Sequence, residues 1–138
     1  MLYQANGERS PKQFTNMKKI SASELAKAFQ AYKNCIASKN TFWDDKWKSQ
    51  IEEMVDLLPS GSGIDTGCQF DWDKSTGEKL VFNLSFHHMD DGFYNGWTQH
   101  TITITPSFVF GYSMKISGKD RNGIKDYLSD VFGSLFTL

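Results

Sequence analysis

The sequence predicts an α+β fold with two layers, in which a four-stranded antiparallel meander carries three helices on one face, in the order ααββββα. Three observations lead to this prediction. Apolar residues recur every three or four positions up to residue 58, then at alternate positions from 64 to 116, and again at helical spacing from 124 to 135. A period near 3.6 indicates amphipathic helices, and a period of 2 indicates half-buried strands. The helices therefore have one apolar sheet face to cover.

The first two helices are expected to form an antiparallel hairpin, because only a short link separates them. A capping box of Ser21 and Glu24 should begin the first helix, since each side chain can bind a free backbone N–H of the other residue. The second helix should start at residue 40 or 41 and end at Leu58, before Pro59 and a Gly-Ser-Gly segment. The two expected apolar stripes are Leu25, Phe29, Tyr32 and Ile36, and then Trp43, Trp47, Ile51, Met54, Val55 and Leu58.

Four strands are expected to follow, each with one apolar and one mostly polar face. Turn residues separate them in the segments STGE, DDGFYNG and Thr-Pro-Ser. A third helix should close the chain, with Asp120 or Asn122 as its cap. The expected inward-facing strand residues are Ile64, Cys68, Phe70, Trp72, Leu80, Phe82, Leu84, Phe86, Ile102, Ile104, Phe108, Phe110, Tyr112, Met114 and Ile116. The expected stripe of the last helix is Ile124, Tyr127, Leu128, Val131, Phe132 and Leu135.

Length and composition predict one domain over residues 20–138, preceded by an irregular leader over residues 1–19. Fifteen basic and sixteen acidic residues give a net charge of −1, which argues against a generally basic nucleic-acid binder. The two cysteines, Cys35 and Cys68, are expected to be small buried hydrophobic residues in a reducing compartment. No apolar run is long enough to span a membrane, so we expect a cytoplasmic protein with no membrane partner.

All three histidines lie in the segment LVFNLSFHHMDDGFYNGWTQHTITIT, residues 80 to 105. Alternation along the strands places His88 and His100 on the core side, close across a hairpin, and His87 on the polar side. Together with Asp90 or Asp91, the pair could supply three ligands to a metal ion, and a metal-dependent hydrolase is one alternative function. We favour the interpretation that both rings lie at the rim of the core and that the aspartates shape a turn.

A second alternative is nucleic-acid binding at the entry to the last helix. A helix N-terminus favours anions, and four basic residues surround it: Lys115, Lys119, Arg121 and Lys125. The order α-β-β-β-α with basic residues at the last helix resembles the double-stranded RNA-binding domain. An extra strand, an extra helix, and the charges of Asp120 and Asp126 depart from that pattern.

The segments NGWTQHTITITPS (95–107) and ISGKDRNGIKDYLSDVF (116–132) resemble small open reading frames carried by bacteriophages and other bacterial mobile elements. The resemblance covers about residues 20 to 138 and brings no activity or catalytic residue with it. It implies an expectation at the level of a class, because small proteins of this origin often bind and block host machinery. CRISPR effectors and restriction systems are examples of such machinery.

We therefore expect a non-catalytic binding module, encoded by a phage or mobile element, that binds a host macromolecule and inhibits a bacterial defence system. A protein partner is favoured over nucleic acid, a homodimer is left open, and no cofactor is expected. Aromatic side chains in the predicted hairpin loop should anchor the partner, beside a polar sheet face. The expected partner-binding residues are Phe93, Tyr94, Trp97, Asn83, Ser85, His87, Gln99, Thr101 and Thr103.

Overall fold

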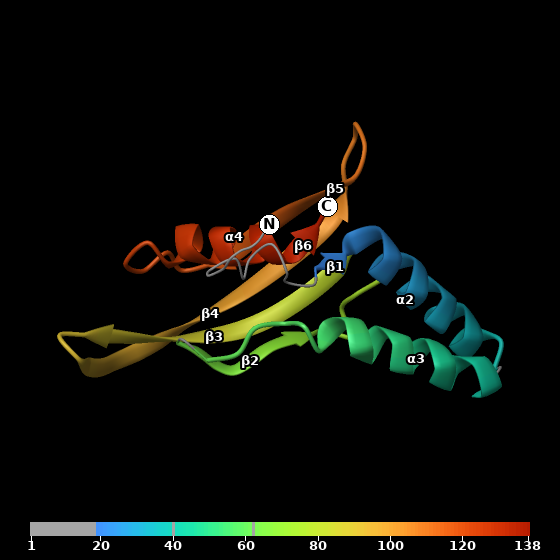
Figure 1. Cartoon of the computed structure of the whole chain (residues 1–138), viewed down its shortest axis with the longest axis horizontal. Helices are drawn as coiled ribbons and strands as arrows, with labels where there is room; N and C mark the ends of the chain where they lie inside the picture. The colour runs from blue at the N-terminus through green and yellow to red at the C-terminus, as the bar shows by residue number, and fades with distance from the viewer. Residues whose placement is uncertain (1–18, 40, 62) are drawn as a thin grey trace, which may run out of the picture.

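The computed structural model describes residues 19–39, 41–61 and 63–138, with only the backbone of residues 41–44, 65 and 66 (Figure 1). The predicted leader lies outside these residues except for Lys19. The elements are β1 (Ile20–Ser21), α2 (Ala22–Ala37), α3 (Thr41–Val55), β2 (Ile64–Phe70), β3 (Leu80–Asp90), β4 (Phe93–Pro106), β5 (Tyr112–Gly118), α4 (Ile124–Leu135) and β6 (Phe136–Thr137).

Strands β2 to β5 form one antiparallel sheet in the order β2-β3-β4-β5, and the predicted α+β architecture is confirmed. Helices α2 and α3 lie side by side and reach past one end of the sheet, while α4 packs beside β5 (Figure 1). The helices contribute to a common core with one face of the sheet. Among the described residues, no helix packs on the other face of the sheet (Figure 1).

Helix α2 begins where the capping box predicts. Ser21 is the N-cap, and its Oγ accepts a hydrogen bond from the backbone N–H of Glu24 at 3.3 Å. Leu25 and Phe29 of the predicted stripe are fully buried, but Ile36 is 45% exposed. The last turns of α2 lie past the end of the sheet, so an apolar residue there has no sheet to pack against.

Helix α3 ends at Val55, short of the predicted end at Leu58. The N–H groups of Leu57 and Leu58 bond to carbonyls three residues back, at Met54 and Val55. This tighter bonding ends the helix ahead of the proline. Ile51 is fully buried, whereas the side chain of Trp43 lies outside the described residues.

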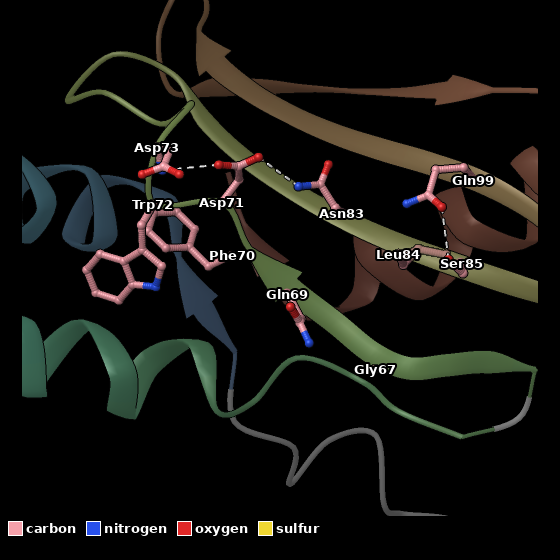
Figure 2. Close-up of a pocket in the computed structure, with 10 residues that line it drawn as sticks. All are labelled: Gly67, Gln69, Phe70, Asp71, Trp72, Asp73, Asn83, Leu84, Ser85 and Gln99. Atoms are coloured by element: carbon pink, nitrogen blue, oxygen red, sulfur yellow. Dashed lines mark hydrogen bonds between the residues drawn. The ribbon is translucent and has the colours of Figure 1, made fainter.

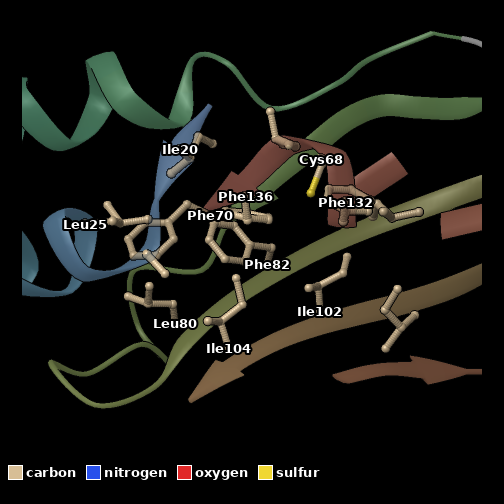
Figure 3. Close-up of a cluster of buried hydrophobic side chains, with 14 of the residues drawn as sticks. Ile20, Leu25, Cys68, Phe70, Leu80, Phe82, Ile102, Ile104, Phe132 and Phe136 are labelled. Carbon is tan, nitrogen blue, oxygen red and sulfur yellow. The ribbon is translucent and has the colours of Figure 1, made fainter. Parts of the chain in front are cut away.

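Even-numbered residues in the middle of the sheet point into the core, as alternation predicts. Phe82, Ile102 and Ile104 are fully buried, beneath side chains of the helices (Figure 3). The rings of Phe29 and Phe70 meet edge-on, with centroids 5.3 Å apart, and so join α2 to the sheet. Trp72 joins this cluster from a turn that follows β2, so its predicted place inside the strand is wrong.

Two short strands were not predicted. Ile20 of β1 and Phe136 of β6 pair in parallel, and both side chains are buried. Strands of two residues are too short to show an alternating pattern, which is why the sequence gives no sign of them. The pair brings the segment before α2 next to the segment after α4.

Strand β5 starts later than expected. Its pairing with β4 ends at Pro106↔Tyr112, and the N–H of Ser107 bonds to the carbonyl of Gly111 to close a loop. The loop side chains are 108%, 86% and 85% exposed at Phe108, Val109 and Phe110. The prediction that Phe108 and Phe110 face the core is therefore wrong, because the apolar alternation continues into a segment that pairs with no strand.

Candidate functional site: the open face of the sheet

The odd-numbered residues of β3, and those of β4 from Trp97 onward, form the face of the sheet opposite the helices, which we call the open face. Cross-strand register places Asn83 beside Thr101 and Ser85 beside Gln99 on this face. All the polar residues predicted to bind a partner lie there, half-buried or exposed: Asn83, Ser85, His87, Gln99, Thr101 and Thr103.

A row of hydrogen bonds crosses the open face. One carboxylate oxygen of Asp71 accepts from the N–H groups of Asp73 and Lys74 at 3.1 and 2.9 Å, and the other accepts from Asn83 Nδ2 at 2.8 Å. Asn83 Oδ1 in turn accepts from the hydroxyl of Thr101 at 3.1 Å. The hydrogen bond from the backbone of Lys74 lowers the pKa of Asp71 most, so this carboxylate is ionised at neutral pH.

A polar pocket of about 370 Å³ lies along this row, between the turn after β2 and the strands (Figure 2). The hydroxyl of Ser85 donates to Gln99 Oε1 at 3.0 Å on its far side. Gln69 and Asp71 also line the pocket and were not among the predicted partner-binding residues. The alternation of β2 places Gln69 on this face, so that residue could have been found from the sequence.

The end of the β3–β4 hairpin has an unpredicted shape. Asp91 and Gly92 alone connect the strands, and both have positive φ, at 51° and 82°. Positive φ at both central residues is the mark of a type I′ hairpin turn, for which Asp-Gly is a preferred sequence. The predicted loop DDGFYNG is therefore too long, because Phe93 to Gly96 belong to β4.

A β-bulge next to the turn decides which aromatic residues share a face. His87 pairs with Trp97 and Met89 pairs with Tyr94, so two residues of β4, Asn95 and Gly96, lie opposite the single residue between His87 and Met89. Gly96 has a φ of 87°, which suits the extra residue. The bulge reverses the alternation along β4. Tyr94 and Trp97, three positions apart, therefore both face the open side.

Four side chains thus form an apolar cluster on the open face, which we call the tip patch: His87, Met89, Tyr94 and Trp97. Met89, Tyr94 and Trp97 are 59%, 56% and 56% exposed, and the rings of His87 and Tyr94 lie 5.2 Å apart. Phe93 pairs with Asp90 and points to the opposite side, where it is 76% exposed. The structure therefore separates Phe93 from Tyr94 and Trp97 and adds Met89.

The buried histidines share one hydroxyl. Thr98 Oγ1 lies 2.8 Å from His88 Nε2 and 2.7 Å from His100 Nε2, while His100 Nδ1 lies 3.2 Å from the carbonyl of Ser117. A carbonyl can only accept, so His100 Nδ1 carries a proton and its Nε2 accepts from Thr98. Thr98 then accepts from His88 Nε2–H. With both rings neutral, each of the three hydrogen bonds then has one donor and one acceptor.

Burial lowers the pKa of His88 and of His100, in agreement with two neutral rings. The charge of Arg121 lowers the pKa of His88 further, and that of Lys125 acts in the same sense on His100. Asp91 is exposed in the turn, and the carboxylate of Asp90 accepts from Asn95 and pairs with Arg121. Over the described residues, no group of three or more His, Cys, Asp or Glu side chains is placed to hold a metal ion.

The cysteines also offer no reactive group at neutral pH near the open face. Cys68 is buried on the core side of β2, and burial raises the pKa of its thiol to about 12. A thiol with so high a pKa stays protonated and is a poor nucleophile. Cys35 is half-buried in α2, and neither cysteine forms a disulfide.

The basic residues around the start of α4 make different contacts. Arg121 Nη2 lies 3.5 Å from the carboxylate of Asp90. The N–H of Lys125 donates to Asp120 Oδ1 at 3.0 Å, but Gly123 occupies the N-cap position, so the prediction of Asp120 or Asn122 as the cap is wrong. The N–H groups of Ile124 and Asp126 bond to nearby carbonyls. The first amides of α4 are therefore used inside the protein, which leaves this helix start poorly suited to bind a phosphate.

No family model, curated protein or solved structure matches this sequence. Within the described residues, no helix has the length and apolar character needed to cross a membrane.

Proposed function

We propose that this protein is a non-catalytic binding module that recognises a protein partner through the open face of its sheet, with the tip patch as the anchor. The bulge at Asn95 and Gly96 is the observation that carries this proposal. It brings Tyr94 and Trp97 to one face beside Met89, where a regular strand would have separated them. Large side chains gathered on one exposed face are a feature of interaction sites.

The energetics of the face suit a protein partner. Burial of tyrosine and tryptophan supplies much of the free energy of binding in protein interfaces, because both are large and have few rotatable bonds. The polar row beside them is already bonded within the protein, through Asp71, Asn83 and Thr101. Polar groups that keep their partners cost little when an interface covers them. An apolar anchor beside a satisfied polar surface is the usual make-up of such interfaces.

The resemblance to open reading frames of phages and mobile elements supports a more specific form of this proposal. A host protein of a defence system, of the CRISPR or restriction type, would be the partner, and binding would block it. The test of this form is a plasmid-interference assay in a bacterium that carries one such system. Expression of the wild-type protein should restore transformation by a targeted plasmid, and expression of a tip-patch variant should not.

The binding proposal is tested directly with the double variant Tyr94→Ala/Trp97→Ala. We expect it to bind the partner captured by the wild-type protein about thirtyfold more weakly or worse, since loss of even one anchor of this kind costs about 2 kcal/mol. The measurement is the dissociation constant of the purified pair. The matched control is Phe108→Ala/Phe110→Ala, which removes two even more exposed rings from the loop between β4 and β5.

Both double variants should melt within a few degrees of the wild type, because the side chains that they remove are largely exposed. Unchanged binding by the Tyr94→Ala/Trp97→Ala protein would show that the tip patch is not the anchor. Loss of binding in the control alone would move the anchor to the loop between β4 and β5.

A further inference from the structure

The two edges of the sheet differ in how much of their backbone is already bonded. At the β2 edge, the N–H of Cys68 donates to the carbonyl of Pro59, and the register with β3 shifts between Asp65 and Gln69. An edge that is covered and bulged is protected against pairing with another strand. At the opposite edge, β5 pairs with β4 in an uninterrupted register from Tyr112 to Gly118.

The outward direction of the β5 backbone follows from one hydrogen bond. The N–H of Tyr112 donates to the carbonyl of Leu138 at 2.9 Å, so it points away from β4. Backbone groups alternate in direction along a strand, so the N–H groups of Met114 and Ile116 point the same way. In the described part of the chain, neither of these two N–H groups makes a backbone hydrogen bond beyond the sheet. Leu138 thus already bonds to this edge as the first residue of an added strand would.

The charge along the β5 edge decides what kind of strand fits it. Lys115, at the centre of β5, is exposed on the open face, and Lys119 follows it at the end of the strand. Lys125 of α4 is near enough to act on His100, whose cross-strand partner is Gly118. Asp120 is the acidic group closest along the chain, and it is bonded to the start of α4.

A second copy of this chain is a poor fit for the edge. Antiparallel pairing of two β5 strands about their centre would place Lys115 opposite its own counterpart. Like charges directly opposite each other destabilise a strand pair, whereas opposite charges stabilise it. A segment with carboxylates on the side that faces Lys115 meets the same edge favourably.

We propose that the β5 edge takes up an extended peptide segment of a partner protein as an added strand, with an acidic side chain opposite Lys115. The outward N–H groups of Met114 and Ile116 supply the main-chain hydrogen bonds, and Lys115 selects the charge of the segment. This mode of recognition combines backbone bonds for affinity with alternate side chains for specificity. The edge is a binding surface separate from the tip patch, so it does not depend on the function proposed above.

The probe is a displayed library of random nine-residue peptides, selected against the immobilised full-length protein. We expect enrichment of Asp or Glu at the position that lies opposite Lys115. In solution, the enriched peptide should slow hydrogen exchange at the amides of Met114 and Ile116, because these groups become bonded. Slower exchange at these two amides distinguishes strand addition from docking on the open face.

Two variants test the edge. Met114→Pro removes an outward N–H while leaving the ladder to β4 intact, because proline is tolerated at such edge positions. Its matched control, Met114→Ala, loses a similar amount of side-chain packing but keeps the N–H. The proline variant should bind the enriched peptide about tenfold more weakly than the alanine variant. Lys115 is exposed, so Lys115→Glu should leave the fold unchanged. When the Lys115→Glu protein is the immobilised target, the selected peptides should be enriched in Lys or Arg instead.

Three results would overturn the proposal. The first is a library with no enrichment of Asp or Glu, and the second is equal binding by the Met114→Pro and Met114→Ala proteins. The third is a dimer of the wild-type protein, seen by sedimentation, that Met114→Pro converts to a monomer. That result would assign the edge to a second copy of the chain.

Discussion

The three histidines show how far single residues can be interpreted from the sequence. Alternation places His88 and His100 on the core side and His87 on the open face, and the structure agrees. The same rule places Thr98 on the core side between the two rings. What alternation cannot supply is the direction of each hydrogen bond, which depends on the carbonyl of Ser117 in another strand. The position of these residues at the rim of the core could be predicted from the sequence, but the donors and acceptors of their hydrogen bonds could not.

The neutral state of the two buried rings makes stability depend on pH. Their pKa values are lowered from 6.5 in the folded protein, so the unfolded chain takes up protons first as the pH falls. Stability from this source is fully present above about pH 6.5 and is lost as the pH falls toward the folded-state values. We expect the urea midpoint to drop between pH 7.5 and pH 5. A midpoint that stays constant over this range would show that the rings are not held neutral.

The matched control for this experiment is His88→Gln/His100→Gln, which removes both titrating rings and should lose most of the dependence of stability on pH.

The lowered pKa of Asp71 affects stability in a different, more acidic pH range. Stability from Asp71 is present above about pH 3.8, its ordinary value, and is lost as the pH falls further. A loss that begins only below pH 4 would therefore point to the carboxylates and not to the histidines.

At the scale of the element, the β3–β4 hairpin was predicted in its strands but not in its turn. The segment contains two turn signals, Asp91-Gly92 and Asn95-Gly96, and the sequence alone does not say which one reverses the chain. In the structure the first signal makes the turn and the second makes the bulge. The composition of the tip patch depends on that choice. This is why Met89 was missed and Phe93 was wrongly grouped with Tyr94 and Trp97.

Two glycine substitutions should change stability in opposite directions. Gly96→Ala forces a side chain onto a φ of 87°, and it should lower the free energy of unfolding by about 1 kcal/mol. Gly133→Ala places a methyl group on an exposed face of α4, with no atom within 4 Å, and should raise it by about 0.5–1 kcal/mol. Urea unfolding of both proteins measures the difference. A stabilised Gly96→Ala protein would show that the bulge does not need positive φ.

At the scale of the whole molecule, periodicity predicted the layers, because alternation and helical stripes are local patterns. It did not predict the contact between the two sequence-distant segments β1 and β6, since pairing across more than a hundred residues leaves no local pattern. It also could not tell an apolar strand from the apolar loop at Phe108 to Phe110, because that distinction depends on where β4 ends. The parts that failed are the ones that long-range contacts decide.

The β1–β6 contact should therefore control the stability of the whole domain. Phe136 is buried, its ring lies 5.2 Å from that of Phe82 in the sheet, and it stacks on Phe132 of α4. Its backbone partner, Ile20, directly precedes the cap of α2. Phe136→Ala should lower the free energy of unfolding by about 3–5 kcal/mol, which is typical of replacing a core phenylalanine with alanine.

Because Phe136 contacts the sheet and α4 and pairs with the strand leading into α2, circular dichroism and tryptophan fluorescence should report one shared transition at lower urea. Phe110→Ala removes the same side chain from an exposed loop and should leave the midpoint unchanged. Separate transitions for helices and sheet in the Phe136→Ala protein would mean that β1 and β6 join two units that fold independently.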